Sequence, residues 1–303
     1  MLKSDMLSKW LVQSLSESNN HQYRHSLLKE NNIFRMEAIP ELKSIINLAH
    51  EDARSHLRRL AGVSLDPLEE YNEGIDPAIG YPERLNLTTL KGYFGEIFAG
   101  IIAQNFSPNG ESEWEIPAFP FRFHDTAFDE LERIRQNDLE EAKTIPGRPG
   151  DDFLAFKKEG DSITRTLACE SKCSSKHDSG LISKAHGQIN EPGIEKPVSI
   201  RQILQILSEK SDDSEVEKWI LALRELLFRQ EKPENYERCD LIVYVCGEKP
   251  KRKLTWMSTD IPHKNYKGKR RLESVEVHLN DVEDLIYTIY NKQKGEKSVS
   301  NIG

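Results

Sequence analysis

The sequence has no excess of positive charge. It contains 42 lysine and arginine residues against 50 aspartate and glutamate residues among 303, which gives a formal net charge of -8. Proteins that hold nucleic acid over their whole surface are usually basic. This composition therefore excludes such broad contact and leaves room only for a local basic patch. An acidic surface also suits a protein partner, although a simply solvated surface is the commoner explanation.

Long apolar runs are also absent. No segment approaches the ~20 continuous apolar residues that a membrane-spanning helix needs, and the opening residues lack the apolar run of a secretory signal. Hydrophobic residues make up 37% of the chain and charged residues 30%. This balance is enough for a core beneath a well-solvated surface. We therefore expect a soluble, cytoplasmic protein.

Cysteine is scarce, with four residues in the chain. Cys169 and Cys173 have a C-x3-C spacing, but Cys239 and Cys246 do not supply the second ordered pair that a zinc site requires. Disulfides are rare in reducing compartments. The sequence therefore predicts free thiols with structural or incidental roles.

Several motifs that mark enzyme classes are missing. The chain has no Gly-rich Walker loop, no helicase motif, no H-N-H metal cluster and no G-x-S-x-G nucleophile elbow. These absences argue against an ATP-driven motor and against a serine hydrolase of the α/β-hydrolase type. Any motor that delivers a substrate must therefore belong to another protein.

Hydrophobic periodicity predicts a chain that contains both helices and strands. Polar or Pro/Gly-rich stretches predict loops at 14–22, 62–85 and 144–152. Helices are predicted at 41–61, 87–106, 125–143, from residue 180, 199–210, 214–230 and 279–292, and strands at 113–119, 152–157, 163–171, 239–246 and 273–278.

This order of elements predicts an α/β fold, a mixed β-sheet flanked by helices. We expect a helical N-terminal extension at 1–85, an α/β domain at 86–292 and a disordered tail at 293–303. Residues 239–246 should form a central, buried strand, because they are almost continuously apolar. Residues 152–157 and 163–171 are close enough in sequence to form a hairpin.

Charged residues occupy particular places in these elements. Asp152 opens one strand of the hairpin, Glu170 and Lys172 close the other, and Glu96 stands in the middle of the apolar helix 87–106. Residues two apart on a strand face the same side, so Glu170 and Lys172 project together while Ser171 points away. Because the strands are neighbours, the Asp152 carboxylate can point at the same spot.

Two carboxylates and a lysine at one spot suit the metal-assisted hydrolysis of a phosphodiester. Mg²⁺ (or Mn²⁺) takes oxygen ligands, and one or two carboxylates suffice when water and a substrate phosphate complete the shell. Bound metal lowers the pKa of its water and so supplies a nucleophile near neutral pH. A lysine beside that water can orient or deprotonate it, or offset charge on the pentavalent phosphate.

The arrangement resembles the PD-(D/E)XK, or restriction-endonuclease-like, nuclease superfamily. The matching features are the helix with Glu96, the strand opening with Asp152, the Glu170-x-Lys172 triplet 18 residues later, and a following helix that carries Gln188. The resemblance covers residues 87–290. It implies a Mg²⁺-dependent DNA nuclease with Asp152, Glu170 and Lys172 as catalytic residues. It also implies metal binding by Asp152, Glu170 and Glu96, the last directly or through water.

Two of these assignments have alternatives. Asp151 competes with Asp152 as the ligand, and we prefer Asp152 because it directly abuts the apolar strand residues FLAF. Glu96 could instead be a buried glutamate paired with a lysine or arginine. The Glu170-x-Lys172 triplet alone also occurs by chance on solvated strands, so the assignment depends on the whole arrangement.

The helix that follows the motif carries further polar residues. Lys184 and Gln188 are accessory candidates, since the resembling family often has a polar residue on this helix near the site. His186 is better explained as a partly buried helix histidine. His177 and Asp178 lie in the loop just after Lys172, where they could contact nucleic acid or simply be solvated.

Basic residues gather at 249–271, where nine lysines and arginines stand against one acid, Asp260, with Trp256 and Tyr266 between them. A loop that binds phosphates between two strands would have this composition, and so would a solvated hairpin tip. The predicted nucleic-acid-binding residues are Lys264, Lys267, Lys269, Arg270 and Arg271.

The combined interpretation is a metal-dependent phosphodiesterase that acts on DNA. A nuclease without its own motor resembles effector subunits of bacterial anti-phage defence systems, such as the nuclease partner of a helicase in Hachiman-type systems. This resemblance implies a helicase or ATPase partner. Two alternatives remain: a catalytically inactive DNA-binding or assembly subunit of the same fold, and a different enzyme whose acid pair is coincidental.

Overall fold

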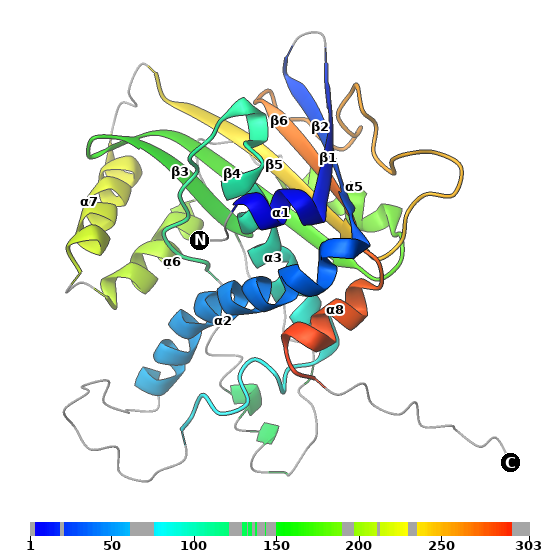
Figure 1. Cartoon of the computed structure of the whole chain (residues 1–303). Helices are drawn as coiled ribbons and strands as arrows, with labels where there is room; N and C mark the ends of the chain where they lie inside the picture. Colours follow the sequence, from blue (N-terminus) through cyan, green and yellow to red (C-terminus); the bar gives the residue numbers. More distant parts are fainter. Residues whose placement is uncertain are drawn as a thin grey trace, which may run out of the picture.

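The computed structural model describes residues 4–18, 21–60, 76–120, 129–131, 133–134, 137, 143, 150–189, 197–210, 213–229 and 235–292. Figure 1 shows their arrangement as a twisted sheet with helices on both faces. The predicted α/β class, with a mixed sheet flanked by helices and a helical N-terminal region, is confirmed.

Six strands form the sheet, in the order β1-β2-β6-β5-β4-β3. The pairs β2/β6, β6/β5 and β5/β4 are parallel, whereas β1/β2 and β3/β4 are antiparallel hairpins at the two edges. The carboxyl ends of four neighbouring strands therefore meet at one edge of the sheet. The strands are β1 (Leu11–Glu17), β2 (Tyr23–Glu30), β3 (Phe153–Glu159), β4 (Ser162–Ser174), β5 (Glu237–Cys246) and β6 (Leu272–His278).

Helices cover both faces of this sheet. The helices α2, α3 and α8 pack on one face, against residues such as Val243 and Val275. On the other face, α6 and α7 cover β3 and β4, while α5 covers β5. In Figure 1, α6 and α7 lie at the β3 end of the sheet, far from β1. The bounds are α1 (Ser4–Trp10), η1 (Asn32–Phe34), α2 (Arg35–Leu60), α3 (Leu87–Asn105), η2 (Pro108–Gly110), α5 (Ser179–Gln188), α6 (Pro197–Ser208), α7 (Ser214–Phe228) and α8 (Val282–Ile289).

Helix α3 is largely buried and packs against the inner strand β4. Its first turn is capped by Asn86, whose side chain accepts a hydrogen bond from the backbone N–H of Thr89 at 2.9 Å. Gly95 lets the helix approach the strand closely, because an added Cβ would lie 3.1 Å from Cβ of Cys173 and 3.4 Å from Oγ of Ser171. This contact sets Glu96, the next residue, beside the carboxyl end of β4.

The N-terminal hairpin departs from the sequence-based prediction. Residues 14–22 were expected to form a loop, but Ser14–Glu17 belong to β1, which pairs with β2. All of β1 after Leu11 is exposed. A solvated edge strand therefore shows no alternation of apolar and polar residues. Because β2 pairs with β6, residues before 85 add two strands to the same sheet as well as helix α2. The domain boundary at 85 stays a prediction.

The strand expected at 113–119 is wrong, since only Glu115 pairs there, in an isolated bridge to Phe156. Glu113 has a positive φ of 62°, and Pro117 has no N–H to donate to a ladder. The other predicted strands are confirmed, as are the predicted helices at 41–61, 87–106, 199–210, 214–230 and 279–292 and the one beginning near 180, with shifted ends. Most of the loops predicted at 62–85 and 144–152, most of the helix predicted at 125–143, and the 293–303 tail lie outside the described residues.

No helix in the described part of the chain is both long enough and apolar enough to cross a membrane. All four cysteines are free thiols, as predicted, and Cys169, Cys239 and Cys246 are buried. Burial raises the pKa of the Cys173 and Cys239 thiols to about 12, so both are protonated at neutral pH. These thiols are packing residues of the core.

Candidate active site at the open edge of strand β4

Strand β4 extends beyond its hairpin partner. The first residue of β3, Phe153, lies opposite Cys169, so residues 170–174 of β4 have no β3 residue beside them. Continuing the register by one residue sets Asp152 opposite Glu170. The carboxylate of Asp152 accepts a hydrogen bond at 2.7 Å from the backbone N–H of Ser171, which would otherwise face the open edge. Asp152 thus continues the pairing of β3 with β4 by one residue, through its side chain.

The three predicted catalytic side chains come together at this edge. The Nζ atom of Lys172 lies 2.5 Å from Oε1 of Glu170 and 3.9 Å from Oδ2 of Asp152. The same ammonium donates to the backbone carbonyl of Ser171 at 2.9 Å. Both carboxylates therefore converge on one point, which the lysine ammonium occupies.

Partial burial makes this ion cluster electrostatically strong. The side chain of Glu170 is 4% exposed, that of Lys172 is 15% exposed and that of Asp152 is 18% exposed. Burial lowers the pKa of Lys172, but the charges of Asp152, Glu170 and Glu96, together with the hydrogen bond to Glu170, outweigh it and raise the pKa above its usual value. Lys172 is therefore a cation at neutral pH.

Glu96 reaches this cluster from the opposite layer. It is buried on α3, and its charge contributes to the raised pKa of Lys172. The helix lies against the end of β4 that has no β3 residue beside it, since Gly95 approaches Ser171 and Cys173. The structure therefore places Glu96 near the site as the sequence predicted, and its electrostatic interaction with a lysine also matches the alternative of a paired, buried glutamate.

Asp151, the rival of Asp152, is turned into the protein. Its Oδ2 accepts a hydrogen bond from Oγ of Ser199 on α6 at 2.9 Å. Its backbone N–H donates a hydrogen bond to this Ser199 Oγ atom, also at 2.9 Å. Its Oδ1 lies 3.9 Å from Nη2 of Arg238 on β5. The structure thus gives Asp151 a structural position that joins β3 to α6. Sequence reasoning missed Ser199 and Arg238, because nothing near them in the chain shows that they meet Asp151.

The donor set of this edge fits a magnesium ion. Asp152 and Glu170 offer hard carboxylate oxygens around a single point, and Mg²⁺ commonly binds one or two carboxylates and fills its remaining positions with water and phosphate. Within the described residues, no group of three or more His, Cys, Asp and Glu side chains is arranged to hold a metal. Glu96 was predicted to bind the metal either directly or through water, and this geometry is compatible with binding through water.

Helix α5 presents its polar residues differently. Lys184 and Gln188 are exposed on the surface of the helix. His186 is buried and hydrogen-bonded, with Nδ1 2.8 Å from the carbonyl of Ile182 and Nε2 3.2 Å from Oγ of Ser274. Burial lowers the pKa of His186 to about 4, so the ring is neutral and structural. Asp178 caps α5 by accepting hydrogen bonds from the first backbone N–H groups of the helix.

The predicted nucleic-acid-binding segment divides into two kinds of residue. Lys264, Lys267 and Lys269 are exposed. In contrast, Arg270 donates from Nε to the buried carboxylate of Asp240 at 2.8 Å and from Nη2 to the carbonyl of Ile189 at 3.0 Å. Arg271 binds the carbonyl of Asn109 and lies 3.6 Å from Glu237. Both arginines therefore hold the amino ends of β5 and β6 in place.

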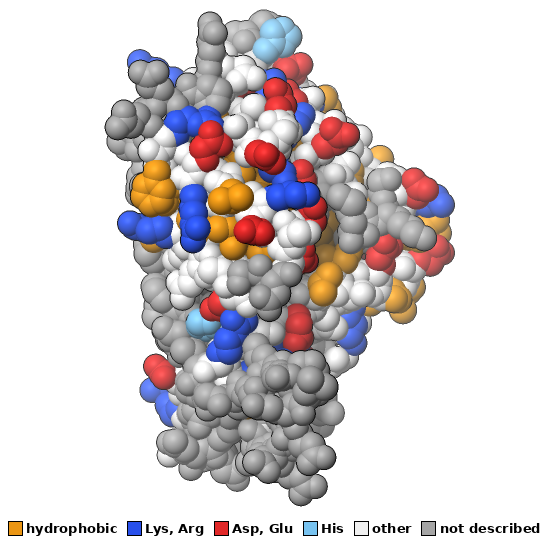
Figure 2. Space-filling model, turned by 90° about the vertical axis from the view of Figure 1, so that its left-hand side faces the viewer, with side chains coloured by type: hydrophobic (Ala, Val, Ile, Leu, Met, Phe, Trp, Pro, Cys, Tyr) orange, Lys and Arg blue, Asp and Glu red, His pale blue; other side chains and the backbone are white. Residues whose placement is uncertain are grey.

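The side of the molecule next to α6 and α7 gives no broad basic surface. In Figure 2, lysine and arginine side chains on this face are mixed with aspartate, glutamate and apolar side chains. This mixture agrees with the net charge of -8. This face therefore offers nucleic acid a local contact at most.

A scan against protein-family models gave no match, and neither did a search of curated proteins.

Proposed function

We propose that this protein is a metal-dependent phosphodiesterase, a nuclease that acts on DNA. The observation that carries the proposal is the convergence of Asp152, Glu170 and Lys172 at the open edge of β4, where the lysine ammonium lies 2.5 Å from Glu170 and 3.9 Å from Asp152. A buried acid and a half-buried acid around one lysine need a reason, because isolating such charges from water is costly. Binding of a metal ion and a phosphate at this edge supplies that reason.

Each residue has a separate role in this proposal. Asp152 and Glu170 would hold Mg²⁺, which would lower the pKa of a bound water and polarise the scissile phosphate. Lys172 would keep its positive charge beside the metal and would offset the charge that develops on the phosphate. Glu96 would contribute negative potential near the lysine.

The direct test is incubation of plasmid and linear DNA with the purified protein, in Mg²⁺ or in EDTA. Wild-type protein should cut in Mg²⁺ and not in EDTA, and Lys172→Ala should lose cleavage by about 100-fold or more, as expected when a group that stabilises developing charge is removed. Lys218→Ala is a matched control, since Lys218 is an exposed lysine on α7 paired only with its neighbour Glu215 in the helix. A parallel RNA substrate tests the choice of polynucleotide.

Two outcomes would contradict the proposal in different ways. Cleavage by Lys172→Ala at the wild-type rate would show that the site is elsewhere. DNA binding without cleavage in either metal, Mg²⁺ or Mn²⁺, would favour the inactive binding or assembly subunit of the same fold.

We further propose that the protein acts with a helicase or ATPase partner as an effector of bacterial anti-phage defence. The support is the absence of any motor motif from the sequence together with an acidic net charge of -8. Copurification from a native host tests this proposal, because a partner with ATPase activity should elute with the protein. Recovery of the chain as a lone, fully active monomer would contradict it.

A further inference from the structure

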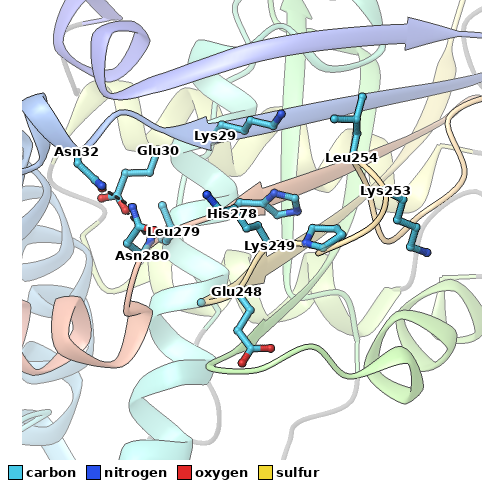
Figure 3. A pocket seen from close by; sticks show the side chains of 12 residues that line it. Lys29, Glu30, Asn32, Glu248, Lys249, Lys253, Leu254, His278, Leu279 and Asn280 are labelled. Atoms are coloured by element: carbon cyan, nitrogen blue, oxygen red, sulfur yellow. Dashed lines mark hydrogen bonds between the residues drawn. The ribbon is translucent and has the colours of Figure 1, made fainter.

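A hollow lined by charged and apolar residues lies at the carboxyl ends of β2, β5 and β6. It has a volume of about 330 Å³ and is lined by Lys29, Lys249, Lys253, His278 and Asn280 among others. Figure 3 shows these side chains coming from three separate parts of the chain: the end of β2, the loop after β5 and the end of β6. Open α/β sheets commonly bind ligands outside the carboxyl ends of their parallel strands. The hollow therefore stands where a ligand site is expected.

The charge balance of the hollow favours an anion. Two acids also line it, Glu30 and Glu248. Glu30 is fully engaged, because it accepts hydrogen bonds from Arg35 at 3.0 Å, from the indole of Trp10 at 2.9 Å and from the backbone N–H of Asn280 at 2.6 Å. The carboxylate of Glu248 points away from the other labelled side chains in Figure 3. Lys253 donates to the carbonyl of Trp256 at 3.3 Å, so Lys29 and Lys249 determine the charge that a ligand would meet.

His278 is buried in the wall of the hollow, whereas the lysines that line it are exposed. Its Nε2 lies 2.6 Å from Oε1 of Glu276, which leaves the other ring nitrogen for a second contact. Glu276 is itself fixed by the backbone N–H groups of Trp256 at 2.7 Å and Met257 at 2.9 Å. The imidazole ring is thus held in a set orientation at the wall of the hollow, as a preorganised binding group requires.

Lys29 and Lys249 are exposed at the rim, and no ion pair of either is found among the described residues. Beside the hollow, the same loop carries Lys251, Arg252 and Trp256 in a wider depression. Cations of this density attract phosphates by charge and by charge-assisted hydrogen bonds. The basic segment predicted at 249–271 therefore has a group of cations around a hollow at its start, near Lys249. Its other exposed lysines lie farther along the chain.

We infer that this hollow binds a phosphate group, as carried by a nucleotide or by the end of a nucleic-acid strand. The inference goes beyond the proposed nuclease site, since Lys29, Lys249, Lys253 and His278 belong to other strands and loops than Asp152 and Glu170. It requires no cleavage activity and no metal ion.

The test is calorimetric titration of the full-length protein in EDTA with four probes: inorganic phosphate, ATP, a short DNA strand with a 5′-phosphate and the same strand with a 5′-hydroxyl. Wild-type protein should bind at least one phosphate-bearing probe more tightly than the hydroxyl strand. The double variant Lys29→Ala/Lys249→Ala should weaken that binding by about tenfold or more, because hydrogen bonds to charged groups carry that magnitude. Both residues are exposed, so folding should be unaffected.

The variant Lys9→Ala/Lys218→Ala is the matched control, since it removes the same charge from exposed lysines on α1 and α7. It should bind as the wild type does. Tighter binding of the 5′-phosphorylated strand than of ATP assigns the hollow to strand ends, and the reverse order assigns it to nucleotides. Failure of every phosphate-bearing probe to bind, or an equal loss of affinity in the control variant, would overturn the inference. Neither result would bear on cleavage at β4.

Discussion

The neighbouring acids Asp151 and Asp152 give the sharpest test of the proposed site, because they have different surroundings in the structure and opposite roles in the proposal. We expect Asp151→Ala to reduce stability and Asp152→Ala to reduce cleavage. Asp151 is 1% exposed, and its loss would leave Ser199 and Arg238 buried without this partner. Breaking a buried charge pair costs about 3–5 kcal/mol.

That magnitude is measurable in a chain of this size. Since about 1 kcal/mol shifts the melting temperature by roughly 2–4 °C in larger domains, Asp151→Ala should melt about 10 °C below the wild type. Asp152→Ala loses the acceptor of the hydrogen bond from the Ser171 N–H, which contributes about 1 kcal/mol. It also loses a 3.9 Å ion pair with Lys172, which keeps its 2.5 Å partner Glu170. Its melting temperature should therefore fall by only a few degrees.

Thermal melting and plasmid cleavage in Mg²⁺, measured on the same preparations, decide the matter. Asp152→Ala should be folded and inactive, and Asp151→Ala should keep cleavage activity at temperatures where it is folded. The opposite pattern, with a stable but inactive Asp151→Ala and an active Asp152→Ala, would refute the assignment of the metal ligand.

Three further predictions concern the metal ion, Arg270 and Glu276. Replacing Mg²⁺ with Ca²⁺ should support DNA binding but little cleavage, because the looser geometry of Ca²⁺ suits ligation better than in-line attack; rapid cleavage in Ca²⁺ would count against the mechanism. Arg270→Ala should destabilise the fold by about 2–4 kcal/mol, because it leaves Asp240 buried beside fewer cations, while Lys264→Ala should leave the melting curve unchanged. Finally, hydrogen bonds outweigh burial and lower the pKa of Glu276 from 4.5 to about 2, so its contribution to stability is present above pH 4.5 and is lost as the pH falls toward 2. The difference in melting temperature between wild type and Glu276→Gln should therefore shrink over that range, and a constant difference down to pH 2.5 would contradict it.

The hairpin that carries the candidate site could be predicted from sequence because its pattern is local. Asp152 directly precedes an apolar strand, and Glu170 and Lys172 share a face by strand periodicity alone. Helix α3 was equally evident, since 13 of its 19 residues are buried and it needs to be apolar on most sides.

The N-terminal hairpin could not be predicted, because its stabilising partners are far away in sequence. Strand β2 contains His25 and Ser26 at buried positions, which is unusual for an inner strand. Ser26 donates to Glu273 at 2.5 Å, and His25 lies 3.7 Å from Glu276. Each polar residue is acceptable in the interior only with its partner on β6, and neither segment alone shows this pairing.

The same reason explains the basic segment at 249–271. A count of lysines and arginines does not distinguish Arg270 from Lys249. Arg270 forms an ion pair with Asp240, whereas Lys249 lines a hollow. The partner of Arg270 lies on β5, and the other walls of the hollow come from β2 and β6. Local composition therefore indicated where basic residues gather, and only the fold shows which of them remain available to a ligand.

Parallel pairing explains why the candidate active site and the inferred phosphate site share one edge of the sheet. The register sets Lys172 beside Tyr244, and Tyr244 beside Glu276, so two strand spacings separate the motif lysine from the strand that ends in His278. At ~4.8 Å for each spacing, this is roughly 10 Å across the sheet. Residues with the same parity also face the same side, which places Glu170, Lys172 and His278 on one face. An acidic protein can therefore present a small basic region near a carboxylate pair without a broadly basic surface, because the sheet collects side chains from distant parts of the chain at the ends of its parallel strands.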